Sequence, residues 1–174
     1  QHDNGDANNF FWQDYMGDLE YVRTAVASAR KHFEANGGNP SELKLFVNDY
    51  NLESDWDQNG KLKSLIKWIE RWEADGVTKI DGIGSQMHIS CYANAATQES
   101  KKNAIVESFK LMASSGKLVR ISELDMGYID ASGNSVATIY LTEEQHQQMA
   151  ELYTFVVSKY LEIIPAAQQW GICQ

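Results

Sequence analysis

Two carboxylic acids that stand two residues apart after a short apolar stretch are the first candidates for chemistry. Glu123 and Asp125 follow Val119 and Ile121, and the period of two of a β-strand predicts that all four side chains share one face. A carboxylate among buried aliphatic side chains is costly unless another group holds it or a reaction uses it. At the carboxyl end of a strand in a parallel barrel, such a group is a catalytic candidate. The alternative is a structural glutamate that caps a helix or pairs with a lysine, since ionisable groups also serve structure.

A second candidate pair, Gln86 and His88, ends the segment 80–89, which is predicted to be one strand. One face of this strand carries Ile83, Ser85 and Met87, and the other carries Gly82, Gly84, Gln86 and His88. Small residues low in the strand and polar side chains at its top indicate a face that opens to a pocket. A lone histidine is more commonly a core residue, but the glutamine on the same face favours the functional alternative. The Gly-x-Gly pattern lacks the third glycine and the helix start of a dinucleotide site.

Polar and aromatic residues also close a third predicted strand, at 43–51. Its apolar run is typical of a parallel strand that is buried on both faces, and it ends in Asn48-Asp49-Tyr50-Asn51. Asn and Asp favour turns in any case, so a plain turn is the alternative for this ending. Tyr50, an aromatic residue at the carboxyl end of a strand, is a candidate for stacking on a sugar.

The elements that must position these residues alternate along the chain. Apolar residues at three- and four-residue spacing predict helices over about 11–36, 61–75 and 98–115, with Trp12 and Tyr15 among the core-facing residues of the first. A fourth helix begins at the capping-box sequence Thr142-Glu143-Glu144-Gln145. The four predicted strands cover 43–51, 80–89, 118–126 and 166–173, the last of which contains Trp170. This alternation calls for a parallel sheet with helices outside it, and places the candidates at the carboxyl ends of strands, where ligands bind.

Composition limits the classes of partner. The 174 residues are 43% hydrophobic with a net charge of -9, so no basic stripe is available to neutralise phosphates, and no nucleic-acid partner is expected. No apolar run is long enough to span a bilayer. Cys91 and Cys173 show neither metal-ligand spacing nor a disulfide framework, and whether they pair is left open. Residues 1–10 are interpreted as a polar loop that faintly resembles a calcium-binding loop without its distal glutamate.

Four segments resemble, in order and spacing, the glycoside hydrolase family 10 endo-β-1,4-xylanases. The segments are Leu45–Asn51, Ile80–His88, Val119–Asp125 and Trp170-Gly171. The resemblance covers about 11–173 and implies an α/β fold, the (β/α)8 TIM barrel, of which this chain would supply about strands five to eight with their helices. Residues 1–174 would then form part of one catalytic domain, and the helix at 11–36 would follow the fourth strand of the barrel.

The resemblance also implies roles for individual residues. Glu123 would be the nucleophile that attacks the anomeric carbon and gives a covalent glycosyl-enzyme, which water opens with retention. His88 would hydrogen-bond this nucleophile, and Asp125 would orient His88. The implied substrate-binding residues are Gln86 beside the cleaved bond, Trp170 as the floor of that subsite, Tyr50 on the leaving-group side and Asn48 in a supporting position. The implied enzyme uses neither a metal nor a cofactor.

One required group has no counterpart in the chain. A retaining glycosidase needs two carboxylates about 5–5.5 Å apart, and in the family the acid/base glutamate ends the fourth strand, in a Trp-Asp-Val-Val-Asn-Glu type motif. That motif is absent from the sequence and is expected upstream of Gln1. We therefore expect the chain to need the amino-terminal half of the barrel as its partner and to be nearly inactive alone. The expected substrate is xylan or a xylo-oligosaccharide, and the family implies a secreted, periplasmic or cell-surface location.

Two alternatives stay open on the sequence. A related barrel would act on another β-1,4-glycan by the same retaining mechanism. A noncatalytic half barrel would instead bind xylan through Trp170 and Tyr50. The missing acid/base glutamate favours the binding protein, whereas Glu123 argues against it, because a binding module has no use for a nucleophile beside a histidine.

Overall fold

The computed structural model describes residues 11–174, which fall into two compact units. One unit consists of the residues up to 45 together with 68–80, and the other of 46–67 together with 81–174. The predicted polar loop at 1–10, with its candidate cation site, lies outside the described residues. Within residues 11–174, none of the helices combines the length and the apolar character needed to cross a bilayer.

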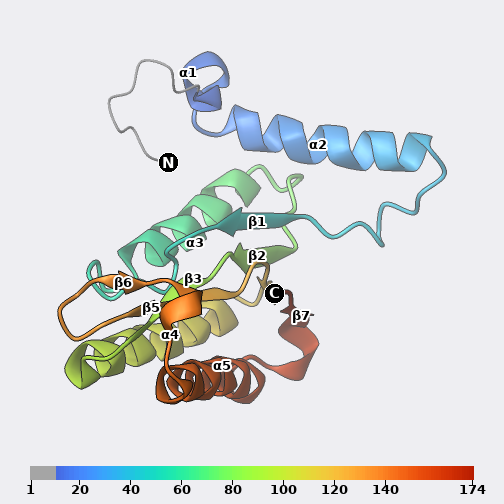
Figure 1. Cartoon of the computed structure of the whole chain (residues 1–174). Helices are drawn as coiled ribbons and strands as arrows, with labels where there is room; N and C mark the ends of the chain where they lie inside the picture. The colour runs from blue at the N-terminus through green and yellow to red at the C-terminus, as the bar shows by residue number, and fades with distance from the viewer. Residues whose placement is uncertain (1–10) are drawn as a thin grey trace. The chain divides into compact units, whose positions relative to one another are not determined.

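The first unit begins with two helices where the sequence pattern predicts one. α1 spans Trp12–Met16 and α2 spans Glu20–Ala35 (Figure 1). The prediction of one helix over 11–36 is wrong because Gly17 adopts a φ of 84°, in the left-handed region that ends helices. Trp12 and Tyr15 are 58% and 72% exposed. The helical spacing that assigned them to the core does not hold across this break.

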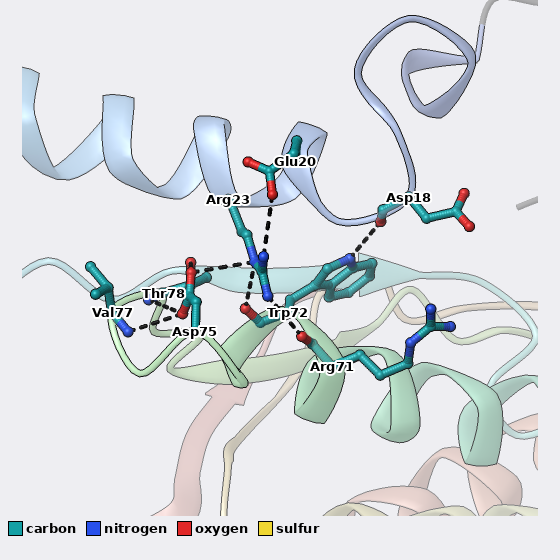
Figure 2. Close-up of polar contacts among 8 residues, drawn as sticks. All are labelled: Asp18, Glu20, Arg23, Arg71, Trp72, Asp75, Val77 and Thr78. Carbon is teal, nitrogen blue, oxygen red and sulfur yellow. Dashed lines mark hydrogen bonds and ion pairs between the residues drawn. The ribbon is translucent and has the colours of Figure 1, made fainter.

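Arg23 of α2 binds the end of α3, which spans Gly60–Glu73. Figure 2 shows its guanidinium donating to the backbone carbonyls of Trp72 and Arg71, at 3.1 and 3.2 Å, and pairing with Asp75 at 3.3 Å. Carbonyls in the last turn of a helix have no helical N–H partner. Arg23 therefore joins α2 to the carboxyl end of α3, the part of α3 that belongs to the first unit.

The second unit contains a four-stranded parallel sheet, as predicted. Its strands are β1 (Phe46–Asp49), β2 (Gly82–Ser85), β4 (Leu118–Ile121) and β7 (Gln169–Ile172), hydrogen-bonded in the order β1-β2-β4-β7. All residues of β2 are buried, as expected for a parallel strand that is covered on both faces. Because a crossover helix separates successive strands of this sheet, the strands can run in the same direction.

Two long helices belong to the same unit. α4 (Ala95–Ser114) and α5 (Glu143–Ile163) lie side by side (Figure 1). The predicted capping box is confirmed: the Thr142 hydroxyl accepts from the N–H of Gln145, and the Gln145 side chain accepts from the N–H of Thr142. The hydroxyl of Tyr160 on α5 donates to a carbonyl of β4 at 2.8 Å. This bond fixes the helix against the sheet.

The predicted strand at 80–89 is interrupted. β2 ends at Ser85, and the chain resumes as β3 (His88–Tyr92). Met87 lies between the two strands with a φ of 61°, a left-handed conformation that a continuous strand cannot contain. The predicted sharing of one strand face by Gln86 and His88 is therefore wrong, because the strand period does not run through Met87.

The predicted strand at 118–126 is interrupted as well. β4 ends at Ile121, and β5 (Asp125–Ile129) begins after a bend at Glu123. β5 pairs in parallel with β3 and antiparallel with β6 (Ser135–Val136), so a second, unpredicted sheet has the order β3-β5-β6. Val119 and Ile121 lie in β4, whereas Glu123 and Asp125 come after its end. The prediction that these four side chains share one face of a single strand is therefore wrong.

The last predicted strand, at 166–173, is shorter than expected. Ala166–Gln168 forms a 3₁₀ turn, η2, and β7 begins only at Gln169. A second 3₁₀ turn, η1, spans Thr138–Tyr140. Trp170 is the second residue of β7 and not a carboxyl-terminal one, which corrects its expected position. The pairing of β7 with β4 shifts register at this point, the irregularity of a β-bulge.

Candidate active site

The three predicted catalytic side chains come together in the second unit. His88 begins β3 and Asp125 begins β5, and the two residues are direct partners in the parallel register. The imidazole Nδ1 lies 2.9 Å from Asp125 Oδ1, and Nε2 lies 3.4 Å from Glu123 Oε2. Glu123 reaches the imidazole from the bend between β4 and β5. The histidine therefore stands between two carboxylates, one at each ring nitrogen.

These carboxylates change the titration of His88. The hydrogen bond to Asp125 raises its pKa above 6.5, the negative charges of Asp125 and Glu123 add to the rise, and partial burial opposes it. The side chains of His88, Glu123 and Asp125 are 43%, 47% and 66% exposed, so solutes can reach them. Since the pKa of His88 is raised in the folded state, protonated His88 stabilises the fold. This contribution is complete below pH 6.5 and is lost as the pH rises through the raised pKa.

Replacing Asp125 with Asn is expected to lower the pKa of His88 towards its ordinary value, because Asp125 makes the largest contribution to the rise. NMR titration of the imidazole in the full-length protein measures this change. Glu107→Gln, which neutralises a half-exposed acid on α4, is the matched control and should leave the titration of His88 in place. Equal pKa values in the parent and Asp125→Asn would show that the two groups do not interact.

Asn48, near the carboxyl end of β1, also contacts Glu123. Its Nδ2 donates to Glu123 Oε1 at 3.3 Å, and its Oδ1 accepts from the hydroxyl of Ser122 at 2.8 Å. Because a carboxylate only accepts, the amide presents its NH₂ group to Glu123 and its oxygen to Ser122. Sequence reasoning missed Ser122, whose only signal is its place beside Glu123. The predicted contact of Asn48 with substrate stays a prediction.

Two glycines of β2 make room for side chains of β1. A Cβ at Gly84 would lie 2.4 Å from Asn48 Oδ1, and a Cβ at Gly82 would lie 2.1 Å from the ring of Phe46. The Phe46 ring in turn lies 5.6 Å from that of Trp170, centroid to centroid. The glycine face was expected to open to a pocket. Instead, side chains from the neighbouring strand occupy the space beside it.

The predicted sugar platforms are partly exposed. Trp170 is 48% exposed, and Tyr50 is 40% exposed with the Lys61 ammonium 3.6 Å from its ring centroid. Gln86 follows β2 and donates its backbone N–H to β1 at 3.0 Å. None of these contacts connects the three predicted residues with Glu123. Their substrate roles therefore stay predictions.

A buried carboxylate, Glu53, was missed in the sequence. It is 7% exposed, and its Oε2 accepts from the hydroxyl of Ser85 at 3.0 Å. Burial raises the pKa of Glu53, while hydrogen bonds and the positive charges of Lys61 and His88 partly offset the rise. Glu53 also lines a pocket that His88 shares. The sequence carries no signal that Glu53 is buried, because its hydrogen-bond partner Ser85 is 32 positions away.

Residues 11–174 contain neither a group of metal ligands nor a disulfide. Among residues 11–174, no three or more His, Cys, Asp or Glu side chains are grouped so that they could hold a metal ion. Cys91 is buried, Cys173 is exposed, and both thiols are free. Burial raises the pKa of Cys91, which keeps its thiol protonated near neutral pH.

The chain matches known enzymes in sequence over its whole length. The family model described as Glycosyl hydrolase family 10 matches residues 1–174. Endo-1,4-beta-xylanase A of Thermoanaerobacterium saccharolyticum is 30% identical over 174 residues, which are 98% of this chain and 12% of that protein. Exoglucanase XynX of Acetivibrio thermocellus is 31% identical over 172 residues, which are 98% of this chain and 13% of that protein. The chain therefore spans only a small part of these relatives.

The chain also matches part of a solved xylanase structure. A mutant of Xylanase10C from Cellvibrio japonicus, in complex with xylopentaose, superimposes with a TM-score of 0.69 at 26% identity. The match covers 98% of this chain and 32% of that chain. The fold of this chain thus matches about a third of that chain.

Proposed function

The chain belongs to glycosyl hydrolase family 10, and on that premise we propose that it is part of a retaining endo-1,4-β-xylanase. Its parallel sheet forms part of the (β/α)8 barrel of the family, as the sequence resemblance implied. The observation that carries the proposal is the setting of Glu123. This half-exposed carboxylate has Asn48 on one oxygen and His88 on the other.

In the first step, Glu123 attacks the anomeric carbon of the sugar. A bond forms between a carboxylate oxygen and that carbon while the bond to the leaving sugar oxygen breaks. A proton from the acid/base glutamate neutralises the leaving oxygen. In the second step the same glutamate takes a proton from water, which attacks the anomeric carbon and releases Glu123. Two inversions at one carbon give net retention.

His88 and Asp125 support both steps through the charge on Glu123. Nδ1–H donates to Asp125, which holds the ring so that Nε2 faces the nucleophile. When both ring nitrogens carry protons, the imidazolium stabilises Glu123 as a carboxylate. The carboxylate is the form of Glu123 that attacks in the first step and the form that leaves in the second. The imidazolium therefore favours both steps.

The acid/base glutamate belongs to a part of the protein outside residues 1–174, in the amino-terminal half of the barrel. General acid–base help is typically worth roughly 10²–10⁴-fold in rate, so residues 1–174 alone are expected to be nearly inactive on xylan. A polymeric xylan substrate also implies a secreted, periplasmic or cell-surface location, which is the location that the family resemblance implied.

A β-1,4-glucanase is the second candidate function, because a relative at 31% identity carries the name exoglucanase. A glucanase of this family would use the same nucleophile and would also retain the configuration of the anomeric carbon. The difference would lie in the residues that contact the substituent on C5 of the sugar, which xylose lacks. Comparison of xylo- and cello-oligosaccharides as substrates separates the two candidates.

The proposal predicts the anomer that the full-length protein releases first. Xylo-oligosaccharide products should appear as the β-anomer in proton NMR spectra taken within the first minutes, before mutarotation mixes the two forms. First-formed α-anomer would mean inversion and would remove Glu123 as a nucleophile. Faster hydrolysis of cello-oligosaccharides than of xylo-oligosaccharides would favour the glucanase.

A further inference from the structure

The connection between β1 and α3 presents an exposed indole on a buried base. Residues on either side of its tip are buried: Leu52 is fully covered, and Ser54 and Asn59 are 7% and 2% exposed. Trp56, at the tip, is 73% exposed. A large apolar side chain in water has not gained the free energy of burial. The contrast within one short segment, here named the Trp56 loop (residues 51–59), indicates a surface prepared for a ligand.

The neighbours of Trp56 are fixed on both sides. Asp55 accepts hydrogen bonds from Ser100 and Lys101 of α4, the first at 2.7 Å. Asp57 accepts from the backbone N–H of Lys61 at 2.9 Å, which ties it to the first turn of α3. Trp56 therefore stands between two anchored residues. A backbone held in this way loses little conformational entropy when a ligand covers the side chain that it carries.

The base of the Trp56 loop is closed by a buried amide. Asn59 Nδ2 donates to the carbonyls of Leu52 and Ala104, both at 3.1 Å. Asn51, Gln58 and Asn59 all adopt a positive φ, between 54° and 57°. Left-handed residues other than glycine persist where the surroundings enforce them, and they are concentrated at ligand sites.

Trp56 lines a pocket whose other walls, which include the buried carboxyl group of Glu53, suit a hydroxylated ligand. Asn51 and Ser90 supply amide and hydroxyl groups, and Tyr92 supplies a second aromatic ring. The pocket's lysine, Lys101, is already paired with Asp55, so the pocket does not present it as an uncompensated cation. Sugars combine hydroxyl edges with apolar ring faces, which is the chemistry that an indole beside amides and hydroxyls can bind.

The pocket adjoins the candidate active site through one residue. His88 lines the pocket and also lies 3.4 Å from Glu123. Glu123 itself is not among the pocket's walls. A sugar in the pocket would therefore be a different unit of the chain from the one attacked at Glu123.

We propose that the Trp56 loop forms a further subsite, in which the Trp56 indole stacks on one sugar unit of the xylan chain that is bound at Glu123. This proposal rests on the proposed xylanase function. It assigns Trp56 to chain-length preference: the subsite adds affinity only for substrates long enough to reach it.

The test compares Trp56→Ala with the parent in the full-length protein, on xylo-oligosaccharides of two to six units. For the longest substrates kcat/KM should fall about tenfold, the scale expected when the burial of one aromatic face is lost. For the shortest substrates it should be unchanged. Trp56→Phe, which keeps an aromatic face, should recover most of the loss. Tyr140→Ala, which removes another exposed aromatic ring at 74% exposure, is the matched control and should match the parent throughout.

Equal losses on all lengths, or no loss on any, would overturn the subsite while leaving the xylanase proposal intact. If the parent hydrolyses no xylo-oligosaccharide, the proposed function fails, and calorimetric binding of xylohexaose decides the subsite separately. Weaker binding by Trp56→Ala than by the parent would then still support it. Equal binding, or no binding by either protein, would overturn it as well.

Discussion

Glu123→Gln should abolish the hydrolysis of xylan by the full-length protein, with kcat falling on the order of 10⁴-fold or more, as happens when a nucleophile is removed. The amide has nearly the same shape as the carboxylate but cannot form the glycosyl ester. Asn48 and His88 are within reach of either side chain, so the fold and the binding of xylan should be retained. Reducing-sugar release measures the rate, and calorimetry with xylohexaose measures the binding.

The matched control for this substitution is Glu162→Gln, which neutralises an exposed acid on α5 and should leave kcat unchanged. Unchanged hydrolysis in Glu123→Gln would remove this residue from the mechanism. Loss of binding together with hydrolysis would instead assign Glu123 to substrate recognition.

Gly82→Ala should give the largest loss of stability among single methyl additions to the sheet. A Cβ at this position would lie 2.1–2.7 Å from three atoms of the Phe46 ring, and the two residues face each other in the β1–β2 register. Adding a methylene to a well-packed core typically costs about 1–3 kcal/mol, so the free energy of unfolding should fall by that amount. Because Phe46 packs on Trp170, the tryptophan fluorescence should change too.

Gly127→Ala is the matched control in β5. A Cβ there would meet only Ser90 Oγ, at 3.8 Å, which is ordinary contact. Urea unfolding of both variants and the parent, monitored by circular dichroism, gives the comparison. If both variants unfold at the parent's urea concentration, Phe46 does not pack over Gly82 as described.

The parts of the fold that could be predicted are those that depend on local pattern. The capping box needs only Thr142 and Gln145, three positions apart, and it forms as predicted. The parallel sheet follows from the alternation of helices and strands, because each strand's apolar run and each helix's stripe lie within one segment. Glu123, His88 and Asp125 were also expected to meet, and they do, although the roles assigned to them stay predictions.

The parts that could not be predicted depend on backbone breaks or on distant partners. Periodicity continues through Gly17 and Met87 in the sequence, whereas the left-handed backbone at both positions ends an element. Ser122 acquires its role from Asn48, 74 positions away. The sequence gives no reason to single out Trp56, because the bonds that anchor Asp55 and Asp57 on either side of it appear only in the structure. No pattern within one segment can report a contact of that kind.

The most direct measurement is to locate the covalent intermediate. A 2-deoxy-2-fluoro-β-xylobioside with a good leaving group reacts without help from the general acid, and its fluorine slows release, so a glycosyl-enzyme should accumulate. Mass spectrometry of the full-length protein should show one added xylobiosyl group, and peptide mapping should place it on Glu123. An adduct on another carboxylate, such as Glu53 or Asp125, or the absence of any adduct from an active enzyme, would contradict the assignment of Glu123 as the nucleophile.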